Sequence, residues 1–224
     1  MINTVLVTGS CSGMGKAITL EFLNHGHLVV GIDRLGCPKD LEEYTNYNHF
    51  VADVADPSSL PSIERVEILI NNAGVQGTDS DIDVNLRGVM NCTEKYALNN
   101  PYITAVLNQA SAAAHLGNDF PQYVASKGGV IAYTKWTAKE IAKYGATCNS
   151  ISLGGVVTLS NGPVIYSEEL WQQVMDLTPL HKWCSEDEVA KWVYFLTTVN
   201  KSASGQDFVI DNLESLNGRF VWND

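Results

Sequence analysis

The sequence contains no long hydrophobic run and comparatively few basic residues. Its longest apolar stretches, 28–32 and 66–70, are far shorter than the roughly 20 residues that a membrane-spanning helix needs. Lysine and arginine number 14 against 25 aspartates and glutamates, and the resulting net charge of −11 repels phosphate backbones and anionic lipid. The first residues also lack the basic start and cleavage pattern of a signal peptide. We therefore expect a cytoplasmic protein with neither a nucleic-acid partner nor a membrane partner.

Cysteine and histidine are too scattered to predict a disulfide framework or a metal site. The five cysteines are odd in number and widely spaced, at Cys11, Cys37, Cys92, Cys148 and Cys184. This pattern suits a reducing compartment. His25 and His27 are two residues apart, so they would not share one helix face. We expect no metal.

What the sequence does contain is an alternation of two kinds of segment. Near-continuously apolar runs predict strands buried on both faces, at 4–8, 28–33, 49–52, 67–72, 105–109, 147–153 and 207–210. Helical patterns lie between them, at 15–25, 81–99, 123–144, 168–177 and 185–198. The alternation predicts an α/β, doubly wound fold: about seven parallel strands with helices on both faces. Without repeats or linkers, residues 1–224 form a single domain.

A glycine-rich loop, Thr8-Gly9-Ser10-Cys11-Ser12-Gly13-Met14-Gly15, joins the first predicted strand to the first predicted helix. Glycines here permit a tight turn, close approach of a pyrophosphate and close packing of helix on strand. Backbone amides and the helix N-terminus then bind phosphate without a lysine. The loop therefore predicts a Rossmann-type dinucleotide site.

An acidic residue, Asp33, ends the second predicted strand about twenty residues after Gly13. A carboxylate there accepts hydrogen bonds from both ribose hydroxyls and repels a 2′-phosphate, which favours NAD over NADP. Arg34 is either a solvated loop charge or a partner for that phosphate, so NADP also stays open.

Three side chains suggest acid–base chemistry. Tyr123 and Lys127 share one face of a predicted helix, and an ammonium near a phenol favours the phenolate, which would lower the pKa of Tyr123. Ser111 follows the strand at 105–109, at the end where doubly wound sheets bind ligands.

With these motifs in order, the chain resembles the short-chain dehydrogenase/reductase family nearly from end to end. The family's glycine loop, strand-end acid and Ser, Tyr and Lys correspond to the residues above. Its remaining motifs correspond to Asp53-Val54 at the adenine, to Asn71-Asn72-Ala73-Gly74 and to the helix residue Asn85. Each motif is common by itself, but the ordered set is specific.

The resemblance implies hydride transfer between a nicotinamide ring and an alcohol or ketone. It makes Tyr123 the proton carrier and Ser111 a hydrogen-bond partner of the substrate oxygen. Lys127 would lower the pKa of Tyr123 and bind the nicotinamide ribose, and Asn85 would hold a proton-relaying water. The cofactor contacts implied are Gly9, Ser12, Gly13, Met14, Gly15, Asp33, Arg34, Asp53, Val54, Asn72, Ala73, Gly74, Tyr123, Lys127, Val156 and Thr158.

The chain departs from the family pattern away from its catalytic motifs. The segments joining Asp53, Asn71 and Asn85 are short, and Pro57 and Pro61 leave room only for a stub of helix between the third and fourth strands. The family's usual Pro-Gly after the sixth strand reads Gly154-Gly155, and its usual Asp-Gly-Gly after the last strand reads 211–213 as Asp-Asn-Leu.

A substrate lid is expected around 158–182. Its apolar residues, Tyr166, Trp171, Met175 and Leu177, predict either an apolar cover for a hydrophobic or cyclic substrate or a surface helix packed on the body. His115 and Gln122 are further candidates for substrate contact.

Small residues along the helix at 123–144, among them Gly128 and Ala132, allow another helix to approach closely. In the resembled family this helix builds a homodimer or homotetramer, and an exposed apolar patch there would explain Trp136 and Ile141. Alternatives within the function are a 3-oxoacyl thioester reductase and a cyclic alcohol dehydrogenase. A catalytically silent nucleotide-sensing protein is the alternative outside it.

Overall fold

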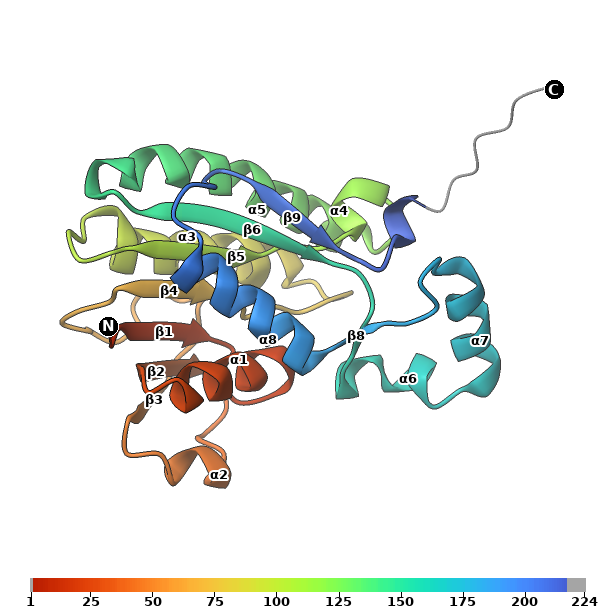
Figure 1. Ribbon diagram of the computed structural model, residues 1–224, viewed down its shortest axis with the longest axis horizontal. Helices are drawn as coiled ribbons and strands as arrows, with labels where there is room; N and C mark the ends of the chain where they lie inside the picture. The colour runs from red at the N-terminus through yellow and green to blue at the C-terminus, as the bar shows by residue number, and fades with distance from the viewer. Residues whose placement is uncertain (1, 217–224) are drawn as a thin grey trace.

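The computed structural model describes residues 2–216, which build one seven-stranded sheet with every neighbouring pair of strands parallel. The strand order is β3-β2-β1-β4-β5-β6-β9 (Figure 1). The strands are β1 Thr4–Thr8, β2 Leu28–Asp33, β3 Tyr47–Val51, β4 Ile68–Asn71, β5 Ala105–Gln109, β6 Thr147–Leu153 and β9 Asp207–Ile210. This order is that of the dinucleotide-binding doubly wound fold, so the predicted fold class is confirmed.

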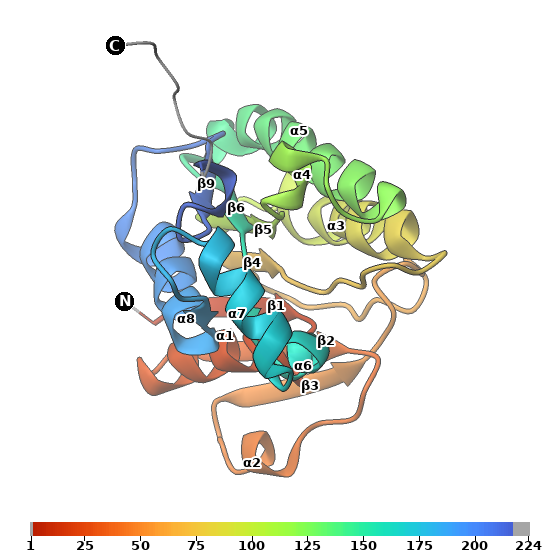
Figure 2. The same ribbon diagram turned by 90° about the vertical axis from the view of Figure 1, so that its right-hand side faces the viewer.

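Helices cover both faces of the sheet (Figures 1 and 2). On one face lie α1 Gly13–Asn24 and α8 Glu186–Tyr194, the latter starting with the expected capping box at Ser185 and Glu188. On the other lie α3 Gly88–Thr93, between π-helical turns at Asp83–Arg87 and Glu94–Leu98, and α5 Pro121–Ile141.

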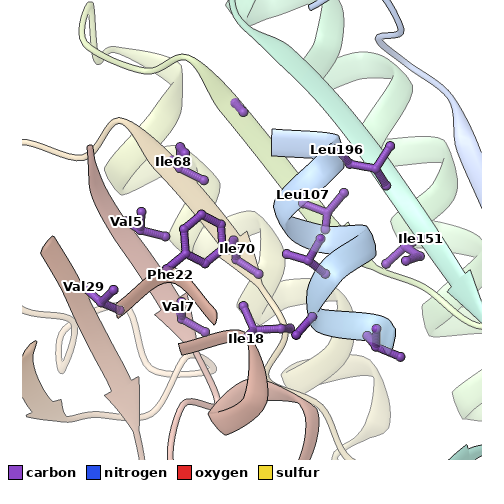
Figure 3. Close-up of a cluster of buried hydrophobic side chains, with 14 of the residues drawn as sticks. Val5, Val7, Ile18, Phe22, Val29, Ile68, Ile70, Leu107, Ile151 and Leu196 are labelled. Carbon is purple, nitrogen blue, oxygen red and sulfur yellow. The ribbon is translucent and has the colours of Figure 1, made fainter. Parts of the chain in front are cut away.

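The two faces have separate apolar cores because successive strand residues point to opposite sides of the sheet. Val5, Val7 and Ile70 pack with Ile18 and Phe22 of α1 on one side (Figure 3). On the other side, a second core draws on the alternate strand residues, including Leu6, Leu69, Val106 and Cys148. Burial on both faces explains why the strands read as unbroken apolar runs.

The expected stub of helix between β3 and β4 is wrong, because residues 52–67 form turns and no helix. Proline lacks the backbone N–H that a helix requires, and side chains satisfy the local backbone instead. Asp53 N donates to Ser59 Oγ (3.0 Å), and Lys95 Nζ donates to Leu60 O (2.6 Å). Conversely, three short helices, α2 Lys39–Glu42, α4 Ala113–Leu116 and α6 Gly162–Ile165, have no counterpart among the predicted elements.

All five cysteines are free thiols. Across residues 2–216, no helix combines the length and apolarity needed to cross a membrane. Within the same range, His, Cys, Asp and Glu side chains do not gather in groups of three suited to a metal ion.

Candidate active site

A cleft of about 1040 Å³ opens at the carboxyl ends of the central strands. It is lined by the loop from β1 to α1 and by the segments that follow β2, β4, β5 and β6. Every catalytic and cofactor-binding residue expected from the sequence lines this cleft except Asn85. Segments far apart in the chain thus meet in one continuous cavity.

The glycine loop has the backbone conformation that requires glycine. Gly9 and Gly13 have φ of 69° and 54°, in the left-handed region that other residues rarely adopt. A Cβ on Gly15 would lie 1.8 Å from the carbonyl oxygen of Gly9, so α1 must begin with glycine to pack against the loop. Ser12 caps α1 without a side-chain bond to the helix, and the first turn carries no acid, which suits an anion at this end.

The end of β4 fastens this loop. Thr8 Oγ1 accepts hydrogen bonds from the backbone N–H groups of Asn72 and Ala73 (3.0 Å each). In return Asn72 Nδ2 donates to the carbonyl oxygens of Thr8 (3.0 Å) and Gly9 (3.3 Å). The Asn-Asn-Ala-Gly motif therefore holds the loop in place as well as lining the cleft.

At the far end of the cleft, Asp33 is held in a fixed orientation. Its Oδ2 accepts from Cys11 N and its Oδ1 accepts from Leu35 N, both at 3.0 Å. Each oxygen keeps a lone pair for a further donor. Arg34 lines the same end and is exposed, and it makes no ion pair with any described residue. Asp53 Oδ1 accepts from Ala55 N (2.9 Å) beside the buried Val54.

The Tyr123–Lys127 pair stands at the start of α5, where Pro121 opens the helix. Lys127 Nζ donates to Gln109 O (2.9 Å) and lies 5.7 Å from the centre of the Tyr123 ring. Burial lowers the pKa of Lys127 to about 8, and the nearby Asp81 opposes this shift.

The expected lowering of the Tyr123 pKa by Lys127 is not what the structure gives. Burial of the phenol dominates and raises its pKa, and the charges of Asp119 and Asp81 add to the rise. A hydrogen bond with Ser111 works in the opposite direction. Tyr123 therefore rests in the protonated form at neutral pH.

Asn85 lies beside this pair but does not reach the cleft. Its Oδ1 accepts from Val75 N, and its Nδ2 donates to Val75 O, both at 2.8 Å. Nδ2 also donates to Ser126 Oγ (3.2 Å). A Cβ on Gly74 would lie 3.1 Å from Asn85 Oδ1 and 3.6 Å from Lys127 Nζ. The Asn85 side chain thus clamps the cleft wall at 74–75, with both Nδ2 hydrogens engaged and one acceptor position of Oδ1 left over.

The apolar residues expected in the lid do not line the cleft. The segment folds into a 3₁₀ turn at Leu159–Asn161, α6 Gly162–Ile165 and α7 Glu168–Leu177, beyond the carboxyl ends of the strands (Figures 1 and 2). None of its four apolar candidates lines the cleft: Tyr166 and Leu177 are 78% and 65% exposed, Met175 is buried, and Trp171 packs edge-on against Trp183 (5.3 Å). What lines the cleft from this segment is polar, namely Thr158, Ser160 and Asn161.

His115 and Gln122 do not line the cleft either. His115 Nε2 instead lies 2.7 Å from Asp207 Oδ2 and 3.3 Å from Ser152 Oγ, which ties α4 to β6 and β9. Gln122 is exposed at the start of α5.

Two cleft residues gave no signal in the sequence, because only the tertiary fold brings them there. Both carboxylate oxygens of Glu214 accept a hydrogen bond from Gly155 N (3.1 and 3.2 Å). The Trp183 ring covers the same glycine, since a Cβ on Gly155 would lie 1.9 Å from it. No side chain therefore fits at Gly155, and at Gly154, where the family has proline, a Cβ would lie 2.6 Å from Glu214 Oε2 and 2.8 Å from the Cα of Asp211.

Comparisons with known proteins agree with this arrangement. The family model described as "short chain dehydrogenase" matches residues 3–169. The 3-oxoacyl-[acyl-carrier-protein] reductase FabG of Staphylococcus aureus is 29% identical, over 88% of this chain and 92% of that protein. The enzyme of the same name from Thermotoga maritima is also 29% identical, over 92% of this chain and 95% of its own length.

Solved structures give the same result. A putative 2-deoxy-d-gluconate 3-dehydrogenase from Agrobacterium tumefaciens, with bound NADP, superposes with a TM-score of 0.87 at 25% identity, covering 95% of this chain and 96% of the other. A 4-hydroxyisoleucine dehydrogenase complexed with NADH has a TM-score of 0.84 at 23% identity, covering 94% and 97%. With its motifs in order around one cleft and a family match over most of its length, the chain belongs to the short-chain dehydrogenase family and is an oxidoreductase.

Proposed function

We propose that this oxidoreductase transfers a hydride between NAD and an alcohol/ketone pair by means of Ser111, Tyr123 and Lys127. The observation that carries the proposal is the single cleft that contains the glycine loop, Asp33 and these three side chains. Bound NAD would supply the hydride acceptor, or NADH the donor, at the nicotinamide ring.

The lining residues fit a dinucleotide of this kind. The open amides at Ser12–Gly15 would bind the pyrophosphate, and Asp33 would accept hydrogen bonds from the adenosine ribose. Asp53 and Val54 would adjoin the adenine, with Asn72, Ala73 and Gly74 along the middle of the cleft. Met14, Val156 and Thr158 complete the lining, towards the nicotinamide.

In the proposed mechanism, Tyr123 donates its phenolic proton to the ketone oxygen during reduction and accepts a proton during alcohol oxidation. Its raised pKa supplies the protonated form that reduction requires. Ser111 hydrogen-bonds the substrate oxygen, and Lys127 stabilises the phenolate that forms. Asn85 positions the cleft wall through Val75 and would hold the water that relays a proton from Lys127 to solvent.

Cofactor choice is tested by Asp33→Asn, which removes the charge but keeps a hydrogen-bond acceptor for Cys11 N. Wild type should bind NADH more tightly than NADPH, and the variant should shift this ratio toward NADPH by about tenfold, an energy of about 1.4 kcal/mol. Fluorescence titration of both nucleotides measures the ratio, with the exposed Glu43→Gln as a charge-matched control. A wild type that prefers NADPH would mean that Arg34 dominates this end of the cleft.

A second candidate function, reduction of 3-oxoacyl thioesters, rests on the curated relatives of that name. The net charge of −11 is unfavourable for docking an acidic carrier protein, so we rank it second. Assays with a 3-oxoacyl thioester, free and carrier-bound, separate the two candidates.

We further propose a homodimer or homotetramer assembled through α5, acting in a reducing cytoplasm that suits the five free thiols. Residues 158–182 would cover the substrate side of the cleft. Trp136 is 45% exposed and stacks on Tyr133 (5.3 Å), and a Cβ on Gly128 would meet nothing within 4 Å. An apolar surface with small residues suits close helix packing.

Trp136→Glu should therefore convert the oligomer to monomers, because it would bury a charge in the interface. Light scattering coupled to size-exclusion chromatography measures the mass. The matched control is Trp192→Glu, since Trp192 is 40% exposed on α8 at the opposite face. A monomeric wild type, or equal dissociation of both variants, would disprove this interface.

A further inference from the structure

The reacting end of the cleft is polar and lacks an anion-binding cation. Its side chains beyond Ser111 include the neutral Gln76, Thr78, Asn118, Ser160 and Asn161. Among the described residues, the basic side chains that line the cleft are Lys127 and Arg34. Lys127 is already assigned to Tyr123, and Arg34 lies at the adenosine end. The two acids at the reacting end are Asp119 and Glu214. An anionic substrate matches this lining poorly, and apolar side chains such as Leu116 and Trp183 line the cleft beside the polar ones.

Glu214 is a half-buried carboxylate without a counter-charge among residues 2–216. Burial raises its pKa, as does the neighbouring Asp211, and the hydrogen bond from Gly155 N offsets part of the rise. Gly155 N donates to both of its oxygens, the Trp183 side chain also lowers its pKa through a hydrogen bond, and residues 2–216 supply no further donor for the remaining lone pairs. A carboxylate in such a place is stabilised by ligand hydroxyl groups that donate to it.

The position of Glu214 relative to the catalytic serine follows from two backbone links. Ala112, next to Ser111, donates its N–H to Leu153 O (2.8 Å). Gly155, two residues after Leu153, donates its N–H to the Glu214 carboxylate. The carboxylate therefore lies on the cleft wall that follows β6, next to the strand end that carries Ser111, and Trp183, which covers Gly155, supplies a flat apolar wall there.

Asp119 lies on the Tyr123 side of the same space, close enough for its charge to affect the phenol. Its Oδ2 accepts from Gln76 Nε2 (2.6 Å) and its Oδ1 accepts from Phe120 N (2.7 Å). Each oxygen retains a further acceptor position. Asp119 and Glu214 are thus two carboxylate acceptors in the lining of the same cleft.

We propose, on the basis of the function proposed above, that Glu214 is a specificity-determining residue that binds hydroxyl groups of a polyhydroxylated substrate, a sugar or cyclic polyol. Asp119 serves as the second acceptor, and Trp183 packs against the apolar face of the ring. Anionic alcohols are disfavoured, since two carboxylates would repel them.

The test compares kcat/KM for cyclohexanol, a vicinal cyclohexanediol and a panel of cyclitols, aldoses and alditols, with a hydroxycyclohexane carboxylate as the anionic member. Wild type should favour the best polyol over cyclohexanol by at least about tenfold. Glu214→Gln should lower kcat/KM for that polyol by roughly 10- to 100-fold, mainly through KM, because hydrogen bonds to a charged acceptor are lost. Cyclohexanol should change by less than about threefold, and the anionic alcohol should improve. The charge control is Glu64→Gln, at an exposed site outside the cleft.

The outcomes separate this inference from the function on which it rests. Tyr123-dependent turnover without a polyol preference, or an equal loss for all substrates in Glu214→Gln, would overturn the inference and leave the proposed function intact. Absence of hydride transfer with every substrate would overturn the proposed function. In that case calorimetry of the polyol panel with the NADH complex tests the Glu214 site without turnover. Binding that Glu214→Gln weakens would support the site, and a failure of every polyol to bind would reject it.

Discussion

Replacing Tyr123 by phenylalanine is expected to lower kcat for ketone reduction by roughly 10²- to 10⁴-fold, the usual contribution of a positioned acid–base group. The phenol is the group that would donate the proton, and the substitution removes its hydroxyl while keeping the ring. Steady-state oxidation of NADH with a ketone panel measures the effect. Because the substitution keeps the half-buried ring and removes only the hydroxyl, NADH affinity should change little.

The matched control is Tyr102→Phe, since Tyr102 is 51% exposed outside the cleft and should leave kcat unchanged. Equal rates in wild type and Tyr123→Phe would contradict the proposed mechanism. Binding of NADH without turnover of any ketone would favour a nucleotide-sensing protein.

Gly15→Ala is expected to have the second largest effect, because its Cβ would lie 1.8 Å from Gly9 O and 2.5 Å from Asn72 Nδ2. The backbone cannot yield locally without moving the loop that is fastened to β4. NADH affinity should fall by at least about a hundredfold. The free energy of unfolding should drop by about 1–3 kcal/mol, as for an overpacked site.

Nucleotide titration and denaturant unfolding measure the two effects in parallel. Gly36→Ala is the control, since a Cβ there would meet nothing within 4 Å. If Gly15→Ala binds NADH as tightly as wild type does, the glycine loop is not the phosphate site.

The sheet was predictable from sequence because its strands are buried on both faces and so read as apolar runs. The helix at 81–98 was predictable from the periodicity of its apolar residues. The helix at 186–194 was predictable from its capping box. The turns at 52–67 were not, since side-chain bonds such as Ser59 Oγ to Asp53 O (2.9 Å) decide them. Local sequence patterns do not carry that information.

The cofactor half of the cleft was predictable because its residues lie in contiguous motifs at strand ends. The substrate half was not. Glu214 reaches the cleft only because β9 lies beside β6, so its distance from Gly155 in the chain conceals the contact. The apolar side chains of the segment at 158–182 could not be placed from the sequence either. Those expected to cover a substrate are instead exposed, buried in the body or packed on Trp183.

The central claim is tested most directly by following deuterium into the product alcohol from NADH that carries deuterium at both C4 positions of the nicotinamide. Mass spectrometry of the product measures the transfer, with wild type and Tyr123→Phe compared at equal NADH occupancy. The account predicts one deuterium at the carbinol carbon, formed by wild type roughly 10²- to 10⁴-fold faster than by the variant. Transfer at the same rate by both proteins, or product alcohol without deuterium, would contradict it.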